Sequence, residues 1–219
     1  MFNMTFGIPI IINNIGLPEK QLKKMRKVMS EKLDLTGKSN LYTGDTHPED
    51  VYESQILATP AFKCLVDPIL EHTHAYLKEL TSHYNEYQQF IMKSWPVVMK
   101  TGGSVEHHTH AYAHLSAVFY LDDPEPDCGG CLTFVKDMNH PLGKLGVDNT
   151  QMDSPISGGW VEIAPKKNGL VVFPSVMPHF VSTYNGKKPR YSISCDLMNI
   201  KSSGQTEHCL IPPDKWIAS

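Results

Sequence analysis

The first third of the chain has the hydrophobic spacing of helices, after one short apolar stretch at residues 6–12 that predicts a strand. Pro18 is a residue type that is common in the first turn of a helix. From there onward apolar residues recur every three to four positions, at Leu22, Met25, Val28, Met29 and Leu33. Similar spacing predicts a second helix from about Pro60 to about Ser82. Residues 35–50 are rich in Gly, Ser, Asn, Asp and Pro, which predicts a loop between the two helices.

Beyond Tyr84 the pattern changes to short β-rich segments that are separated by turn residues. Strands are predicted at residues 89–99, 115–121, 132–135, 160–163, 169–173 and 191–197. Many short strands with regularly spaced turns are typical of a closed or two-sheet antiparallel architecture. The two helices would then pack on one outer face of this β structure.

The sequence shows no internal repeat and no linker, so we expect one domain over residues 1–219. It would comprise a helical N-terminal support (1–84), a β core (85–200) and a C-terminal tail (201–219). Residues 138–159 form a long segment with little apolar content, which is typical of a lid or a binding loop.

The composition argues against several classes of protein. A hydrophobic content of 41% and a charged content of 20% are ordinary for a soluble globular chain. The net charge of −3 provides no basic field that would recruit nucleic acid. No apolar run approaches the ~20 residues of a membrane span, and the N-terminus lacks the features of a signal peptide. Five scattered cysteines, an odd number, indicate reduced thiols and hence an intracellular protein.

Four of the eleven histidines fall between His107 and His114, and this density suggests a metal site. Residues two apart on a strand point to the same face, so His108 and His110 could converge on one ion. A third ligand is available in His179, which follows the apolar segment GLVVF and a Pro-Ser turn. Three imidazoles suit iron, zinc, copper or nickel, and they leave an open position for water.

Arg190 begins the segment RYSISCDL, eleven residues after His179. Strand alternation places Ser192 and Ser194 on the same face as this arginine. A guanidinium on an inner face is costly to bury unless it pairs with an anion. It binds a carboxylate through two parallel hydrogen bonds, and Ser192 can add a hydroxyl to the same group.

The stretch from His108 to Ser194 resembles the core of the 2-oxoglutarate and iron(II)-dependent oxygenases. The matching segments are HTH, LSAVFYLDDPEPDCGGCLTF, VEIAPKKNGLVVFPSVMPHFV and RYSIS. The N-terminal segments FGIPI and SNLYTGD also resemble a bacterial and phage subgroup of these enzymes, which carries a His-x-His motif. Such an enzyme would lie in the cytoplasm of a bacterium or of a phage-infected host cell.

This resemblance implies a mainly β fold with N-terminal helices, a double-stranded β-helix or cupin-like jelly roll. It implies that His108 and His179 bind iron(II), and that Arg190 and Ser192 hold the distal carboxylate of 2-oxoglutarate. Lys100 occupies a position that often touches this co-substrate in the superfamily. No catalytic residue is implied beyond the metal site. The substrate would be an amino acid, a peptidyl side chain or a small metabolite, hydroxylated with release of succinate and CO2.

His110 departs from the family pattern, because it stands where a carboxylate ligand is usual. Either it completes a three-histidine site, which we favour, or it stands off and a water or another carboxylate takes its place. Two other functions stay open: a cupin-like three-histidine dioxygenase that needs no 2-oxoglutarate, and a non-catalytic β-barrel binding or structural protein. A zinc hydrolase would need a general base, for which only Glu106 is available.

Overall fold

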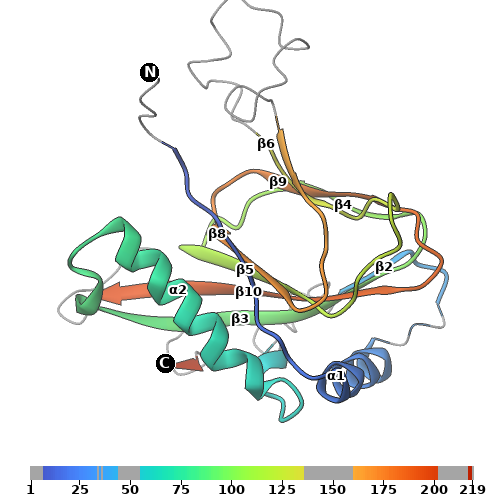
Figure 1. Ribbon diagram of the computed structural model, residues 1–219, viewed down its shortest axis with the longest axis horizontal. Coiled ribbons are helices and arrows are strands. Elements are labelled where there is room, and N and C mark those ends of the chain that lie inside the picture. Colours follow the sequence, from blue (N-terminus) through green and yellow to red (C-terminus); the bar gives the residue numbers. More distant parts are fainter. Residues whose placement is uncertain are drawn as a thin grey trace, which may run out of the picture.

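The computed structural model describes residues 7–33, 35, 37–43, 55–135, 160–201 and 217–218. Its strands form two antiparallel sheets that face each other, with the two main helices outside the larger sheet (Figure 1). This mainly β architecture with N-terminal helices confirms the fold class predicted from the sequence. The segment 138–159 lies outside the described residues, as does most of the predicted C-terminal tail.

The larger sheet carries the long strands of the fold. Its order is β1 (Ile11–Asn14), β8 (Gly169–Pro174), β5 (Leu115–Tyr120), β10 (Arg190–Lys201), β3 (Tyr87–Met99) and β11 (Ile217–Ala218). A seventh strand, β2 (Leu41–Thr43), pairs with the far end of β3. β8 and β5 are almost wholly buried, which explains the continuous apolar runs from which these strands were predicted.

The smaller sheet is shorter and more polar. Its order is β4 (Gly103–His108), β9 (His179–Tyr184), β6 (Leu132–Val135) and β7 (Trp160–Ile163). The strands β4 and β9 escape prediction from hydrophobic pattern alone, because β4 is largely exposed and both contain histidine, serine or threonine. They nevertheless carry two of the three predicted metal ligands, His108 and His179.

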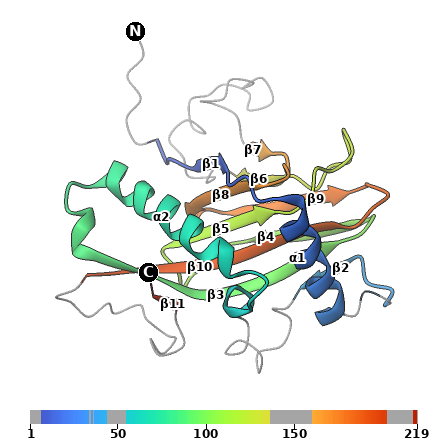
Figure 2. The same cartoon turned by 60° about the horizontal axis from the view of Figure 1, so that its bottom comes forward.

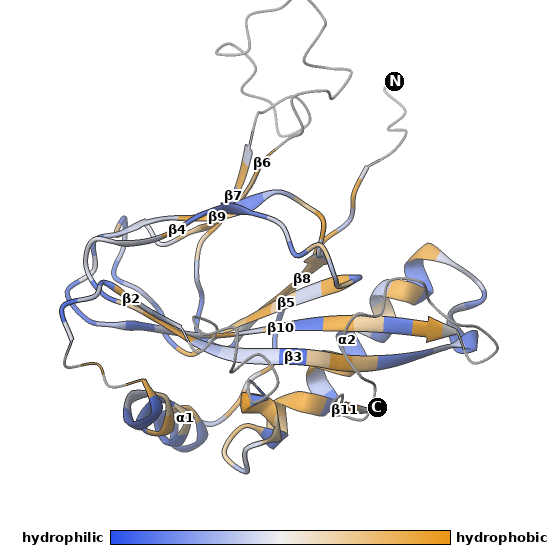
Figure 3. Cartoon of the chain, turned by 180° about the vertical axis from the view of Figure 1, so that it is seen from behind, coloured by the Kyte–Doolittle hydropathy of each residue, from blue (hydrophilic) through white to orange (hydrophobic). Residues whose placement is uncertain are grey.

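The helices α1 (Glu19–Lys32) and α2 (Val66–Leu80) cover the outer face of the larger sheet, as the turned view shows (Figure 2). Each combines hydrophobic and hydrophilic positions (Figure 3). The buried side chains Leu22, Met25 and Met29 of α1 join the main hydrophobic core under β5, β8 and β10. Burial of such a side chain contributes roughly 1.5–3 kcal/mol each, so this layer anchors the sheet whose inner face lines the site.

Several boundaries differ from the sequence expectation. The second helix starts at Val66 rather than near Pro60, because residues 56–65 form two 3-10 turns, η2 (Ile56–Ala58) and η3 (Lys63–Leu65). A third such turn, η4 (Tyr84–Glu86), leads into β3. The first strand covers Ile11–Asn14 instead of residues 6–12, of which Phe6 lies outside the described part.

Neither α1 nor α2 is long and apolar enough to cross a membrane, nor is any other helix in the described ranges.

Candidate metal centre

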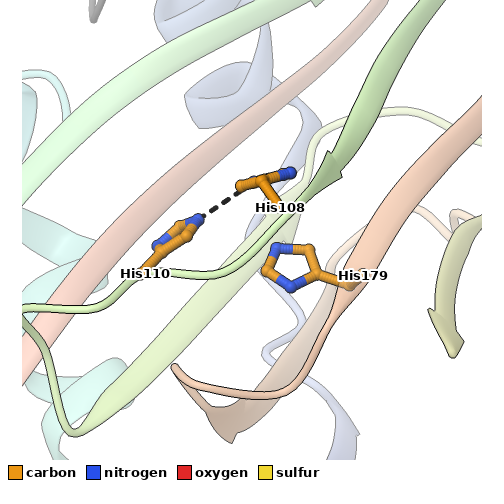
Figure 4. A group of neighbouring side chains, drawn as sticks. All are labelled: His108, His110 and His179. Carbon is orange, nitrogen blue, oxygen red and sulfur yellow. Dashed lines mark hydrogen bonds between the residues drawn. The ribbon is translucent and has the colours of Figure 1, made fainter. Parts of the chain in front are cut away.

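The three predicted histidines lie together between the two sheets. His108 ends β4 and His179 begins β9, and the antiparallel register places these two residues directly opposite each other. Their ring centroids are 4.3 Å apart, and the ring of His110 lies 5.1 Å from that of His108. One ring nitrogen from each of the three lies within 4.8 Å of the others, and the rings converge on one point (Figure 4).

His110 reaches this point from the loop that follows β4. The strand prediction covered both His108 and His110, but β4 ends at His108. The backbone N–H of His110 donates a 2.9 Å hydrogen bond to the carbonyl of Ser175, which ties the loop to the connection between β8 and β9. This hydrogen bond holds the backbone for two residues beyond the end of β4. The side chain of His110 therefore lies on the same side as that of His108, as strand alternation predicts.

The hydrogen bonds of the rings fix which nitrogen is available to a metal. The Nδ1 atoms of His108 and His179 lie 2.8 Å from the carbonyl oxygens of Glu106 and Met177. The Nδ1 atom of His110 lies 2.6 Å from a carboxylate oxygen of Asp196. Carbonyl and carboxylate oxygens can only accept, and the Ser116 hydroxyl, 3.1 Å from Nδ1 of His110, donates its one hydrogen to Asp196. In each neutral imidazole Nδ1 therefore carries the hydrogen and Nε2 keeps its lone pair.

This assignment leaves two lone pairs facing each other, since the Nε2 atoms of His108 and His110 are 3.1 Å apart. Two acceptors at that distance repel unless a cation or a proton lies between them. Ligand nitrogens about 2.0–2.1 Å from a metal lie roughly 3 Å apart when they share that metal. The geometry therefore fits a bound divalent ion.

Burial keeps His108 and His179 in the neutral form that binds metals. It lowers the pKa of His179 to about 4 and also lowers the pKa of His108. The rings of Phe134 and Phe173 pack around His179, with centroids 6.1 and 4.9 Å away, and exclude water from it. An uncharged imidazole can bind a metal without first losing a proton, so this environment favours metal binding near neutral pH.

Arg190 is a buried cation without a carboxylate partner among the described residues. Its guanidinium donates to the carbonyl of Gly130 and lies 5.5 Å from the ring of Tyr120. Its Nε atom is buried and has no hydrogen-bond partner. Burial lowers the pKa of Arg190, because desolvation disfavours the charged guanidinium. An anionic ligand would supply the missing partner.

A cavity of about 620 Å³ joins these features. The three histidines, Arg190 and Ser192 all line it. Ser192 lies two residues along β10 from Arg190 and is itself buried. The cavity is large enough for a small co-substrate together with part of a second molecule.

Lys100 does not reach this cavity. Its ammonium group donates to the carbonyl of Leu35 and to the hydroxyl of Tyr42, and it lies 4.6 Å from the centre of the Tyr42 ring. The structure therefore brings five of the six residues singled out from the sequence to one cavity and places Lys100 elsewhere.

Sequence reasoning missed Asp196, which also lines the cavity and contacts His110. The signal was present, since Asp196 continues the alternation of Arg190, Ser192 and Ser194 along one face of β10. Only the fold shows that the loop after β4 brings His110 to this carboxylate.

Comparisons with known proteins agree with this geometry. Residues 93–196 match a family model described as "Putative 2OG-Fe(II) oxygenase". A search of curated proteins found no match.

Solved structures share the fold at low identity. A Pseudomonas putida prolyl-4-hydroxylase is 17% identical with a TM-score of 0.56, covering 87% of this chain and 92% of its own. The epimerase SnoN of nogalamycin biosynthesis is 14% identical with a TM-score of 0.59, covering 96% and 91%. HygX from Streptomyces hygroscopicus, crystallised with nickel and 2-oxoglutarate, is 11% identical with a TM-score of 0.57, covering 87% and 83%.

Iron(II) and 2-oxoglutarate are the cofactors of the matched family. The residues present fit both, because three Nε2 atoms face one point and a buried guanidinium opens into the same cavity without an acidic partner. Residues 93–196 thus resemble the 2-oxoglutarate and iron(II)-dependent oxygenases, and the solved structures share the fold over most of the chain.

Proposed function

We propose that this oxygenase is a hydroxylase whose iron(II) is bound by His108, His110 and His179. Arg190 and Ser192 would hold the distal carboxylate of 2-oxoglutarate, which is released as succinate and CO2. The observation that carries the proposal is the single cavity into which three histidines and an unpaired buried arginine open. Lys100 has no part in it, because its ammonium group is engaged outside the cavity.

The residues of the chain supply binding, orientation and the exclusion of water. When bound, iron(II) and 2-oxoglutarate would supply oxygen activation, driven by decarboxylation of the co-substrate. Arg190 fixes one end of the 2-oxoglutarate molecule through charge-assisted hydrogen bonds. The buried rings of Tyr120 and Phe173 line this side of the cavity, and Phe134 packs against Phe173. This apolar group keeps competing water away.

The remaining part of the cavity is suited to a small or extended substrate. Trp95 lies beside the metal centre, with its ring centroid 5.7 Å from that of His110. Met92, Val105 and Val181 add apolar surface to the lining. An amino acid, a peptidyl side chain or a small metabolite could each place a C–H bond near the metal while its apolar part contacts these groups.

The neighbouring structures support hydroxylation without restricting the chain to it. They include the prolyl-4-hydroxylase of Pseudomonas putida and a viral collagen prolyl hydroxylase, but also an epimerase and a carbocyclase. We favour hydroxylation because it is the outcome that needs no further group from the protein beyond the metal and co-substrate site.

The test is anaerobic titration of the protein with iron(II) and 2-oxoglutarate, which should produce a weak visible metal-to-ligand band. Arg190→Ala should abolish the band at co-substrate concentrations that saturate the wild type. Arg26→Ala is a matched control, because Arg26 is a half-buried arginine that pairs with Asp122 outside this cavity. A band that survives Arg190→Ala unchanged would favour a three-histidine dioxygenase that needs no 2-oxoglutarate.

Succinate release then identifies the reaction. Under air, candidate amino acids, peptides and small metabolites should be compared for succinate formed per substrate consumed, and each product should be weighed by mass spectrometry. A gain of one oxygen atom supports hydroxylation, whereas a product of unchanged mass or one that has lost two hydrogens contradicts it.

A further inference from the structure

The histidine ligands differ in what holds their outer nitrogen. His108 and His179 each face a neutral backbone carbonyl, of Glu106 and Met177. His110 alone faces a carboxylate, at 2.6 Å from Oδ1 of Asp196. His110 is also the residue that stands where the superfamily usually has an acidic ligand. The three predicted ligands lack the negative charge of the usual acidic ligand, but Asp196 provides a negative charge one hydrogen bond away from His110.

Asp196 is built into the site rather than exposed beside it. Its exposed fraction is 6%, and its Oδ1 atom accepts a second hydrogen bond of 2.7 Å from the hydroxyl of Ser116. That hydroxyl lies 2.9 Å from the hydroxyl of Ser175, whose backbone carbonyl holds the N–H of His110. Both ends of His110 are thus fixed by one buried polar network.

The strand β10 carries two charged groups of the cavity, Arg190 and Asp196, on one face. Arg190 stands at its start and Asp196 six residues later, with Ser192 and Ser194 between them. The pairing of β10 with β3 shifts register directly after Asp196. Such bulges re-aim side chains and are frequent beside active sites. One strand therefore presents a cation for the co-substrate at one end and an anion for the metal ligand at the other.

Electrostatics gives this carboxylate a specific consequence. Three neutral imidazoles would leave a bound divalent ion with its full double charge, whereas the usual acidic ligand removes one unit. A buried carboxylate bonded to Nδ1–H makes the imidazole a stronger donor and returns negative charge toward the ion. The low exposure of Asp196 means that solvent screens this effect weakly.

We propose that Asp196 is a positioning residue for His110. Its carboxylate turns Nε2 of His110 toward the metal and replaces the negative charge of the missing acidic ligand. The proposal rests on the proposed function, because it requires His110 to bind the metal. Asp196 acts through the imidazole and does not touch the metal, so it differs from an alternative in which a carboxylate takes the place of His110.

The first experiment separates charge from shape with Asp196→Asn, which keeps the size of the side chain and an oxygen that can accept from Nδ1–H. Iron(II) or cobalt(II) is titrated anaerobically into the protein in competition with a chromophoric chelator. We expect the metal to bind Asp196→Asn roughly 10- to 100-fold more weakly than the wild type. The iron(II) and 2-oxoglutarate band of this variant should move to higher energy, because the ion becomes poorer in electrons.

Asp122→Asn is the matched control, since Asp122 is a partly buried, hydrogen-bonded aspartate that contacts none of the histidines. It should bind the metal like the wild type. Equal affinity and an unmoved band in Asp196→Asn would overturn the positioning role and leave the proposed function standing. A wild-type protein that binds no metal would overturn both.

A second measurement uses the metal-free protein and needs no activity. Nitrogen NMR of the 15N-histidine-labelled wild type should show His110 with its proton on Nδ1. Asp196→Asn should retain that tautomer, whereas Asp196→Ala should increase the fraction with the proton on Nε2. A wild-type His110 that carries its proton on Nε2 would contradict the proposal, whatever the affinity measurements show.

Discussion

His108 and His179 lie directly opposite each other across the antiparallel pair β4 and β9. Hydrogen bonding between strands thus sets the distance between two metal ligands that are far apart in the sequence. A metal bound by both would connect the two strands through their side chains as well as their backbones. The stability of the smaller sheet should therefore respond to metal binding.

We expect iron(II), or zinc(II) as a redox-inert substitute, to raise the melting temperature of the wild type at one ion per chain. Metal at about 100 times its dissociation constant adds roughly 2.7 kcal/mol to the free energy of unfolding. The variant His179→Ala should lose this shift. His107→Ala should keep it, because His107 is an exposed neighbour outside the histidine trio. Thermal denaturation with and without metal checks the prediction, and an equal shift in His179→Ala would contradict it.

Replacement of Arg190 by Met should have opposite effects on binding and on stability. The substitution removes a buried charge that lacks an acidic partner, so the metal-free protein should be as stable as the wild type or more stable. Affinity for 2-oxoglutarate should fall by about 100-fold, on the order of 3 kcal/mol, because the co-substrate carboxylate loses its cation. Urea denaturation and calorimetric titration measure the two effects. A large loss of stability without 2-oxoglutarate would show that Arg190 serves the fold instead.

The stability of the metal-free protein should depend on pH through the buried histidines. In the unfolded chain, His179 takes up a proton near its ordinary pKa of 6.5, whereas in the folded protein burial lowers the pKa to about 4. Between these values the unfolded state binds more protons, so the free energy of unfolding decreases as the pH falls. His179 alone accounts for a loss of about 3 kcal/mol, and His108 acts in the same direction.

Urea midpoints measured from pH 8 to pH 4.5 test this dependence. The wild type should be nearly constant above pH 7 and lose stability below pH 6.5. His179→Gln should show a shallower decrease, because its side chain takes up no proton in either state. Parallel curves for the two proteins would show that other groups govern the acid sensitivity.

A side chain at Gly129 should destabilise the protein and should also disturb the position of Arg190. Its φ of +69° is strained for other residues, and a Cβ atom there would lie 2.1 Å from the carbonyl oxygen of Thr183. The next residue, Gly130, supplies the carbonyl that accepts from Arg190. We expect Gly129→Ala to lower the free energy of unfolding by more than about 2 kcal/mol and to weaken 2-oxoglutarate binding.

Gly16→Ala separates the two causes. Gly16 has a similar φ of +72°, but its Cβ would meet only a side-chain atom 3.9 Å away. The Gly16→Ala substitution should therefore lower the free energy of unfolding by only about 1 kcal/mol, which is the strain of the left-handed conformation. Chemical denaturation of both variants checks this, and equal losses would mean that the contact with Thr183 is relieved by movement of the backbone.

The sequence by itself determined the elements with a strong hydrophobic pattern. The spacing of Leu22, Met25 and Met29 predicted α1, and the apolar runs predicted β5 and β8, because burial selects these residues wherever the segment lies in the fold. It also determined which histidines and which arginine were candidates, since their chemistry and spacing match the superfamily core.

Only the tertiary structure decided how these groups meet. Polar strands such as β4 and β9 carry little hydrophobic signal, so the pairing of His108 with His179 follows from a register that local sequence does not encode. The loop after β4 brings His110 to Asp196, and the turn before β6 brings Gly130 to Arg190. Lys100 was assigned by its place along the chain, yet the fold directs it to Tyr42. Contacts between distant segments depend on the packing of whole sheets, and a residue's neighbours in sequence do not fix them.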